Sequence, residues 1–404
     1  MISLQRYRAL FTVPDVRPAL VASIVGRLPI GIAGLAILLF VQNRSGSFAL
    51  AGGASALYVL GLAVIAPFLG RLIDRLGPRP VLIVCGVLYP AALVALTALV
   101  LAGAHPAWIC SAALLAGTSL PPVSACIRTL YPRLISEPSL LQTAYSVDSA
   151  VVELVFILGP AVVAACVAIG YPEVAVLLAA LSAAIGTGVF ARAPAVVRWI
   201  APPLHRPRSW LGVLRPRKLR VVFGATVLYS VGFGLFEVAV TAHAAAQGTP
   251  SAAGLALALA SVGSCAGAVV YGSRYWHAPL PRQFMVALIA MAAGILLLVP
   301  IDNLMLYALA SIVAGVPMAT AIASQSLLVS RLAARERLAE SFTWATTCLL
   351  GGISAGIALG GVMAEWVAAY WLLVAAASTT GAAALLVALC LETDEAPATS
   401  AGTR

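Results

Sequence analysis

Charged side chains are scarce in this chain: aspartate, glutamate, lysine and arginine together make up 9% of its 404 residues. Soluble domains carry about 25% charged residues, so water is not the main solvent of this protein. Hydrophobic residues make up 62% of the chain, and the mean hydropathy is +1.03. The seven cysteines lie within or at the ends of apolar runs without metal-ligand spacing, which indicates core thiols rather than ligands or disulfides.

Motifs for ATP use or catalysis are also missing. The chain has no G-x-x-x-x-G-K-[ST] phosphate-binding loop, so ATP is not its direct power source. The four histidines are scattered, and no nucleophile stands beside a base at matching depth, so we expect neither an enzyme nor a bound metal or cofactor. The net charge of +10 comes from arginines in membrane-surface loops, which indicates no nucleic-acid partner.

Long apolar runs dominate the chain instead. A helix needs about 20 apolar residues to cross a hydrocarbon core about 30 Å thick. The runs lack the period-2 alternation of a membrane barrel, so we predict an all-α membrane protein with twelve spanning helices. The expected spans are 18–42, 49–69, 80–103, 106–127, 144–168, 173–191, 220–246, 252–272, 283–300, 303–328, 341–363 and 367–391.

The arginines predict the orientation in the membrane. All basic residues except Arg27 and Arg44 fall at the chain start, in the connections that follow even-numbered spans, or in the tail. Positively charged loops stay in the cytoplasm, so both termini are expected there. Abundant arginine and alanine indicate a GC-rich bacterial genome, which makes the inner (plasma) membrane of a bacterium the expected location.

Faint repeats at an offset near 200 residues predict two related halves. Gly117 in the fourth span matches Gly315 in the tenth, and Arg133 matches Arg331 in the following connections. Such symmetry is typical of transporters built from two six-helix bundles. The predicted divisions are a cytoplasmic N-terminus (1–17), a first bundle (18–191), a basic cytoplasmic linker (192–219), a second bundle (220–391) and a cytoplasmic tail (392–404).

The most specific motif is a charged stretch between the second and third apolar runs. We predict a tight turn in which Gly70 and Gly77 take backbone angles that are closed to residues with a side chain. Asp74 can accept hydrogen bonds from a basic residue or from a helix start in the other half. Together with Arg75 and Arg79, it would form a latch that holds the halves together and lets go again.

The spacing of these five residues resembles the signature that joins the second and third helices of the major facilitator superfamily, with Pro78 in place of one basic residue. With twelve spans and a central linker, the resemblance covers nearly the whole chain. It implies two pseudo-symmetric bundles around a central cavity that opens to alternate sides of the membrane. It also implies that the first, fourth, seventh and tenth helices line this cavity.

Four ionisable residues are predicted inside or near the edge of the spans: Arg27, Asp148, Glu153 and Glu237. A charge at bilayer depth costs about 2.5–3.5 kcal/mol, so each needs a partner, a proton or water. Arg27 should pair with Glu153 or with Asp148, either as a fixed structural pair or as one that protons or substrate can break. Glu237, in the seventh helix, is the best single candidate for binding a proton or a cationic substrate; a glutamate at a water-filled vestibule without a coupling role is the alternative.

Prolines predict bends in helices that the resemblance places around the cavity. These are Pro29 in the first span, Pro121 and Pro122 in the fourth and Pro317 in the tenth. Gly159-Pro160 in the fifth span resembles an element of proton-driven exporters in this superfamily. Close packing of this helix against the other half is the alternative interpretation.

We therefore expect a monomeric secondary transporter that works by alternating access, with a small-molecule substrate, protons and the lipid bilayer as its partners. The leading version is proton-coupled efflux, by antiport, of a small amphiphilic compound or metabolite. Proton-coupled uptake of a small metabolite by symport is the alternative. A polytopic sensor that transports nothing, or an intramembrane enzyme, ranks lower.

Overall fold

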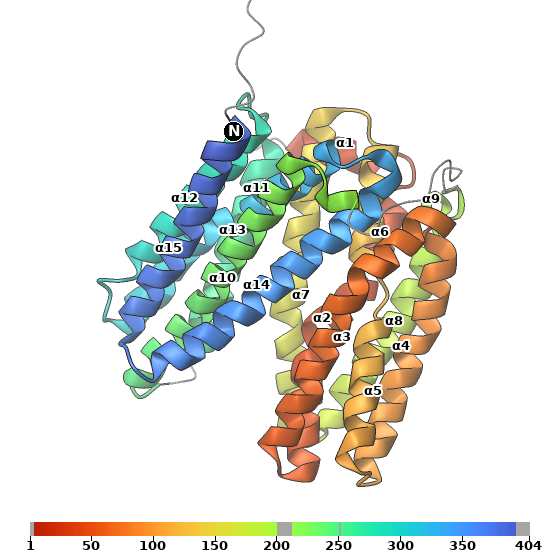
Figure 1. The fold of residues 1–404 in the computed structure, drawn as a ribbon, viewed down its shortest axis with the longest axis vertical. Helices are drawn as coiled ribbons and strands as arrows, with labels where there is room; N and C mark the ends of the chain where they lie inside the picture. The colour runs from red at the N-terminus through yellow and green to blue at the C-terminus, as the bar shows by residue number, and fades with distance from the viewer. Residues whose placement is uncertain (1–3, 200–211, 250–251, 393–404) are drawn as a thin grey trace, which may run out of the picture.

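The computed structural model describes residues 4–199, 212–249 and 252–392, and these ranges contain helices and no strand (Figure 1). The first half consists of α1 (Leu4–Thr12), α2 (Val16–Ser45), α3 (Phe48–Leu76), α4 (Pro78–Leu101), α5 (Pro106–Ser119), α6 (Val123–Leu134), α7 (Pro138–Ala168), α8 (Pro172–Ala191) and α9 (Pro194–Val197). The second half consists of η1 (Gly212–Leu214), α10 (Arg217–Ala246), α11 (Ala252–Ser273), α12 (Leu280–Leu297), α13 (Leu304–Leu332), η2 (Arg335–Arg337), α14 (Leu338–Ala364), α15 (Ala369–Val387) and η3 (Ala388–Glu392).

Twelve segments within the described ranges are long and apolar enough to cross a bilayer, with α5 and α6 together forming the fourth. The predicted number of spans is therefore confirmed. Several helices run past the apolar stretch that predicted them: α3 continues to Leu76, and α7 begins at Pro138. Backbone hydrogen bonds between residues four apart do not require apolar side chains, so a helix continues until glycine or proline stops it.

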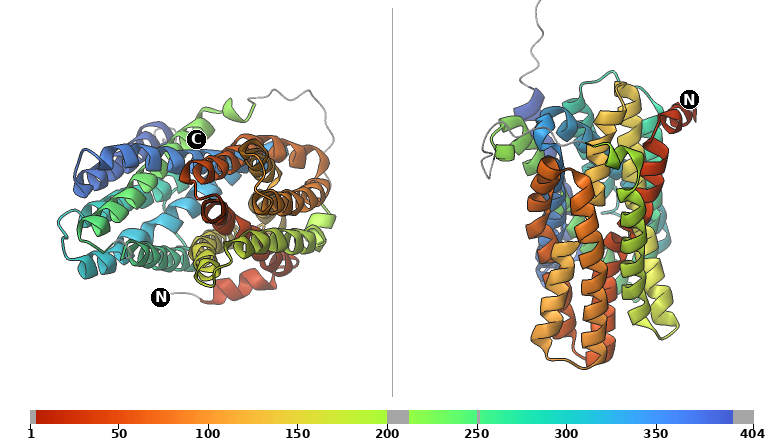
Figure 2. Two further views of the ribbon diagram at one scale, coloured as in Figure 1. Left: turned by 90° about the horizontal axis from the view of Figure 1, so that it is seen from below. Right: turned by 90° about the vertical axis from the view of Figure 1, so that its right-hand side faces the viewer.

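The spans form two bundles, α2–α8 and α10–α15, which lie side by side when seen along the helices (Figure 2). Corresponding helices pack in the same way in each. A Cβ atom at Gly117 would overlap the backbone of Tyr58 on α3, and one at Gly315 would overlap the backbone of Ala260 on α11. The two glycines that the sequence matched thus allow equivalent close contacts, α5 with α3 and α13 with α11.

The bundles converge at the end that carries the α3–α4 connection, which we call the arginine-rich end, and diverge toward the opposite, far end (Figure 1). One buried apolar cluster contains residues of both bundles, such as Ile73 and Leu82 of the first and Phe342 of the second. A second cluster, which includes Ile37 and Phe40, belongs to the first bundle alone. We call the contact of α3, α6 and α7 with α11, α13 and α14 the seam.

Parts of the predicted N-terminus, linker and tail are helical. α1 was not predicted; its buried Leu10 packs into the core, and Tyr7 OH donates to the carbonyl of Val269 on α11 at 2.8 Å. In the predicted linker, α9 and η1 flank residues 200–211, which lie outside the described residues. The predicted tail lies outside them too, apart from its first residue.

Candidate functional site

A cluster of three ionised residues lies inside the first bundle, where α2, α6 and α7 meet. Arg27 Nη2 donates to Asp148 Oδ1 at 2.6 Å, and Arg128 Nε donates to Asp148 Oδ2 at 2.6 Å. Tyr131 OH adds a longer bond of 3.4 Å to the same carboxylate. Within the described chain, Nε and Nη1 of Arg27 are buried and have no hydrogen-bond partner. Two arginines on one carboxylate leave a net positive charge in the bundle.

Asp148 is the partner of Arg27, and Glu153 is not, because α7 begins earlier than the apolar run indicated. Asp148 is ten residues after the start of α7, and Arg27 is eleven residues after the start of α2. At 1.5 Å per residue, both lie about 15 Å along their helices. Glu153 lies one and a half turns further along α7. Of the two predicted partners, the structure therefore selects the second.

Glu153 instead lies at the seam. Its side chain is 2% exposed, and its carboxyl group faces the hydroxyls of Ser261 and Ser264 on α11, in the other bundle. The two helices are close at this level, since Cys265 Sγ lies 4.0 Å from the carbonyl oxygen of Ala150. No ion pair of Glu153 occurs in the part of the chain that the structure describes. A buried carboxyl group without a cation thus lies where the two bundles meet.

Glu237 lies in the far half of α10 and is partly buried. One turn before it, Gly234 lies close to α14: a Cβ atom there would come within 2.8 Å of the nitrogen of Ile357. No side-chain hydrogen bond or ion pair of Glu237 is found among residues 4–199, 212–249 and 252–392. The structure does not bring it together with Arg27, Asp148 or Glu153.

A cavity of about 100 Å³ lies between the first bundle and α14. Its walls come from α2, α3, α5, α6, α7 and α14, and they are mostly apolar, with Ile65 and Phe156 among them. Arg128 is the charged residue of its lining, and Thr343 and Thr346 add hydroxyl groups from the second bundle. Glu237 and Arg27 do not line this cavity.

The predicted prolines act in two different ways. Pro121 and Pro122 line the cavity and interrupt the fourth span: α5 ends at Ser119, and α6 begins at Val123. Two successive residues without an N–H group remove two helical hydrogen bonds, so the helix breaks rather than bends. Pro29 and Pro317 lie inside α2 and α13, which continue as helices through them, and neither lines this cavity as was expected.

Asp74 connects the two bundles at the arginine-rich end. Its carboxylate oxygens accept the backbone N–H groups of Ala339 at 3.1 Å and of Glu340 at 2.8 Å, in the first turn of α14. These donors have no partner within their own helix, and the helix dipole favours a negative charge there. Arg71 Nε donates to Glu340 Oε1 at 2.6 Å beside them. The predicted contact of Asp74 with a helix start of the other half is present.

The glycines of this motif differ from the prediction in one respect. Gly77 has φ +81°, as a turn requires, but Gly70 is helical, because residues 70–76 form the last turns of α3. The predicted turn conformation of Gly70 is therefore wrong. Gly70 is needed for close approach instead: a Cβ atom there would lie 2.8 Å from Cα of Glu340. Only glycine lets α3 approach α14 this closely.

The arginines of the motif make no comparable contact. Arg75 and Arg79 are exposed, and neither has a hydrogen bond or ion pair within the described ranges. Arg79 faces a groove between α4 and α8 in the first bundle. The latch contacts to the second bundle come from Gly70, Arg71 and Asp74.

The contact made by Gly159 also differs from the expected one. A Cβ atom at Gly159 would overlap the backbone of Gly31 on α2, in the same bundle. The fifth span does pack against the other half, since α7 contacts α11 and α13, but Gly159 does not mediate this contact, because its face of α7 is turned inward to α2.

Arg128 and Glu340 are functional candidates that the sequence did not single out. Arg128 was counted among loop arginines because the apolar run ends at residue 127, but α6 continues to Leu134 and leaves it 8% exposed. Glu340 precedes an apolar run and is 2% exposed. An acid in the first turn of a predicted helix was the available signal for Glu340.

Clusters of three or more histidine, cysteine, aspartate or glutamate side chains that could hold a metal ion are not present in the described residues. All seven cysteines are free.

Solved structures of transporters share this fold. A bacterial homologue of the iron transporter ferroportin in an outward-facing state is 13% identical, with a TM-score of 0.76 over 94% of this chain and 99% of that one. The human organic anion transporter MFSD10 (TETRAN) is 16% identical, with a TM-score of 0.72 over 93% of this chain and 99% of that one. A variant of the Escherichia coli fucose:proton symporter FucP is 12% identical, with a TM-score of 0.67 over 94% and 98% of the two chains.

Sequence comparison identifies the family. A relative from Sinorhizobium fredii (strain NBRC 101917 / NGR234), described as the uncharacterized MFS-type transporter y4rN, is 29% identical over 278 residues, which cover 66% of this chain and 68% of the relative. The family model of the Major Facilitator Superfamily matches residues 19–236, more than half of the chain. With twelve membrane spans in two matched bundles and a charged contact between α3 and α14, this multi-pass membrane protein belongs to the Major Facilitator Superfamily.

Proposed function

We propose that the protein is a proton-coupled secondary transporter that exports small amphiphilic compounds by alternating access. The observation that carries this proposal is the position of Glu153 at the seam, where its carboxyl group faces Ser261 and Ser264 of the opposite bundle. An ionised carboxylate without a cation is costly in a buried seam, whereas the neutral acid can hydrogen-bond to hydroxyl groups. Proton binding would then favour the closed seam, and separation of α7 from α11 would release the proton.

Asp148 is less suited to this role. Arg27 and Arg128 both bond to its carboxylate at 2.6 Å, and Asp148 is 1% exposed. A carboxylate neutralised by two cations has no need of a proton. We therefore assign the Arg27–Asp148–Arg128 cluster to holding α2, α6 and α7 together, and Glu153 to proton binding.

The direction of access follows from the arginines. If the arginine-rich end faces the cytoplasm, as charge distribution favours, the seam is closed on the cytoplasmic side and the bundles diverge toward the outside. The ferroportin homologue has been solved in an outward-facing state and FucP in an outward conformation, which supports this arrangement. Both termini would then lie in the cytoplasm, and the protein in a bacterial inner membrane.

The cavity favours an amphiphilic substrate that carries an anionic group. Arg128 supplies positive charge to an otherwise largely apolar wall, because the Arg27–Asp148–Arg128 cluster to which it belongs has two cations and one anion. Glu237, for which a cationic substrate was considered, does not line this cavity. Apolar walls bind compounds that partition into the membrane, which supports removal of such compounds from the cell rather than uptake of polar nutrients.

Proteoliposomes with a pH-sensitive dye inside test the proton coupling. Addition of a transported compound should move protons in vesicles with the parent protein, and Glu153→Gln should abolish this flux while it retains substrate binding, because glutamine preserves the hydrogen bonds but cannot release a proton. Glu173→Gln is the matched control, since Glu173 pairs with Arg44 at the far end of the first bundle. Unchanged proton flux in Glu153→Gln would refute the proposed role.

A bacterial strain without its own efflux pumps tests substrate and direction. Expression of the parent protein should lower the cellular accumulation of amphiphilic anions, and collapse of the proton gradient should restore it. Higher accumulation on expression would instead indicate uptake. Absence of any compound-dependent proton flux in the liposomes would favour a sensor.

A further inference from the structure

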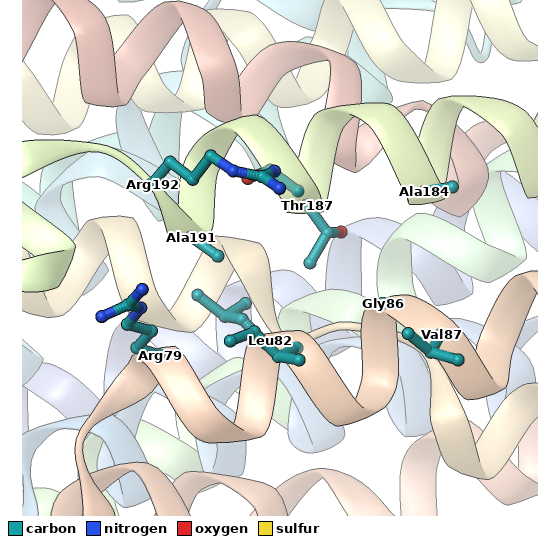
Figure 3. A pocket seen from close by; sticks show the side chains of 10 residues that line it. Arg79, Leu82, Gly86, Val87, Ala184, Thr187, Ala191 and Arg192 are labelled. Atoms are coloured by element: carbon teal, nitrogen blue, oxygen red, sulfur yellow. The ribbon is translucent and has the colours of Figure 1, made fainter.

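A groove lies between α4 and α8 and belongs to the first bundle alone (Figure 3). It has a volume of about 270 Å³. The residues that matter for its chemistry are Arg79, Leu82, Gly86, Val87, Thr187 and Arg192. It is separate from the cavity at the seam, with which it shares no lining residue.

Two arginines mark the mouth of the groove. Arg79 is the second residue of α4, and Arg192 directly follows the last residue of α8, so both lie where their helices end at the arginine-rich end. In Figure 3 the Arg79 guanidinium lies at one end of the groove, and the Arg192 side chain extends along α8 toward Thr187. Arg192 Nη1 donates to the carbonyl of Gly188 at 3.0 Å, and no carboxylate pairs with either arginine in the described chain. Two cations on facing helices without an acid favour a bound anion.

The interior of the groove is apolar and reaches into the membrane. Gly86 lies seven residues beyond Arg79, and Ala184 lies eight residues before Arg192, so at 1.5 Å per residue the groove extends about 10–12 Å from the arginines. Val87, at its rim, is 66% exposed and lies within the third membrane span. A free anion from water would gain nothing from this depth, whereas an acyl chain would.

Small residues keep the groove open. A Cβ atom at Gly86 would come within 3.1 Å of Thr187 Cγ2, so any larger residue would occupy the space between the helices. Thr187 is 1% exposed, and its hydroxyl group has no hydrogen-bond partner in the described residues. In Figure 3 its side chain extends from α8 toward α4. Thr187 turns its methyl carbon Cγ2 toward Gly86, so this part of the groove is apolar.

We propose that this groove binds an anionic phospholipid, with the phosphate held between Arg79 and Arg192 and one acyl chain lying along Gly86 and Thr187. The positive charge at the mouth matches the headgroup of such a lipid, and the apolar surface deeper in the groove matches its acyl chain. The lipid would come from the leaflet at the arginine-rich end. Basic pockets between spanning helices recognise acidic lipid headgroups by this combination. The bound lipid would hold the start of α4 against the end of α8.

Native mass spectrometry of the delipidated full-length protein tests this proposal, with phosphatidylglycerol as the probe and phosphatidylcholine as the neutral lipid. The parent should bind phosphatidylglycerol in preference, and Arg79→Gln/Arg192→Gln should weaken this binding about 30-fold. Arg75→Gln/Arg274→Gln removes two exposed arginines outside the groove and should bind as the parent does. Equal binding by all three proteins would overturn the proposal.

A second variant separates a lipid from a free phosphate. Gly86→Leu fills the apolar part and leaves both arginines in place, so it should lose phosphatidylglycerol about as strongly as the double variant does. Glycerol phosphate, which has the headgroup without acyl chains, should not compete at the same concentration. Undiminished binding by Gly86→Leu, or full competition by glycerol phosphate, would mean that the site recognises phosphate alone and would overturn the lipid assignment.

Discussion

Replacement of Asp74 by asparagine should open the seam at the arginine-rich end. Asp74 is 3% exposed, and it accepts the N–H groups of Ala339 and Glu340 at 3.1 and 2.8 Å. Asparagine retains one acceptor oxygen but turns an NH₂ group toward the second N–H, and it removes the negative charge from the start of α14. A hydrogen bond to a charged group contributes about 1.5–3 kcal/mol, and a carboxylate at a helix start about 0.3–1 kcal/mol. A loss of about 2 kcal/mol lowers the ratio of closed to open protein about 30-fold.

Cysteine labelling in nanodiscs measures this ratio, because both faces of the protein are accessible there. Thr343 on α14 is 3% exposed and lies against Gly70 in the closed seam. In a background without the seven native cysteines, Thr343→Cys should therefore react faster with a polar maleimide when α3 and α14 separate. Asp74→Asn should raise the labelling rate about 30-fold. Asp302→Asn removes a carboxylate outside the seam and should label at the parental rate; equal rates for Asp74→Asn and its parent would refute the reasoning.

Three further predictions concern the contacts at the seam and the Arg27–Asp148–Arg128 cluster. Gly70→Leu places side-chain atoms against Glu340, since even a Cβ atom at Gly70 would lie 2.8 Å from Cα of Glu340, so it should raise labelling at the seam as Asp74→Asn does. A double-mutant cycle of Arg71→Gln and Glu340→Gln should give a coupling free energy of about 1–3 kcal/mol in the same assay, and a value near zero would show that the 2.6 Å pair contributes nothing. Asp148→Asn leaves two buried arginines without a counter-ion and should lower the free energy of unfolding in detergent by about 3–5 kcal/mol. Arg27→Met should lower it less, because Arg128 still neutralises the carboxylate, and equal losses would contradict this account of the cluster.

Much of the site could be predicted because its signals are local. Gly77 takes a positive φ because a chain that reverses between two helices needs one, and Asp74 stands where a short carboxylate can reach an exposed helix start. The sequence limited Arg27 to two acidic partners, Glu153 and Asp148, and the second is correct. It could not choose between them, because an error of six residues in the start of α7 moves every side chain on that helix by about 9 Å.

Other contacts carry no local signal. Arg128 has the sequence context of a loop arginine and is buried because α6 continues to Leu134. Gly70 could supply a turn or a close helix contact, and only the approach of α14 decides between these. Gly159 could face either bundle, and the rotation of α7 turns it toward Gly31.

The sequence by itself determined that the chain lies in a membrane, how many spans it has, which family it resembles and which residues can carry charge in the membrane. These features can be read along one helix at a time, because the length of a span depends only on the thickness of the bilayer and the helical rise. The tertiary structure alone decided which charges meet, which acid remains without a cation at the seam, and where arginines and an apolar groove coincide. Those outcomes depend on the relative shift and rotation of helices far apart in the chain, and packing between them sets both.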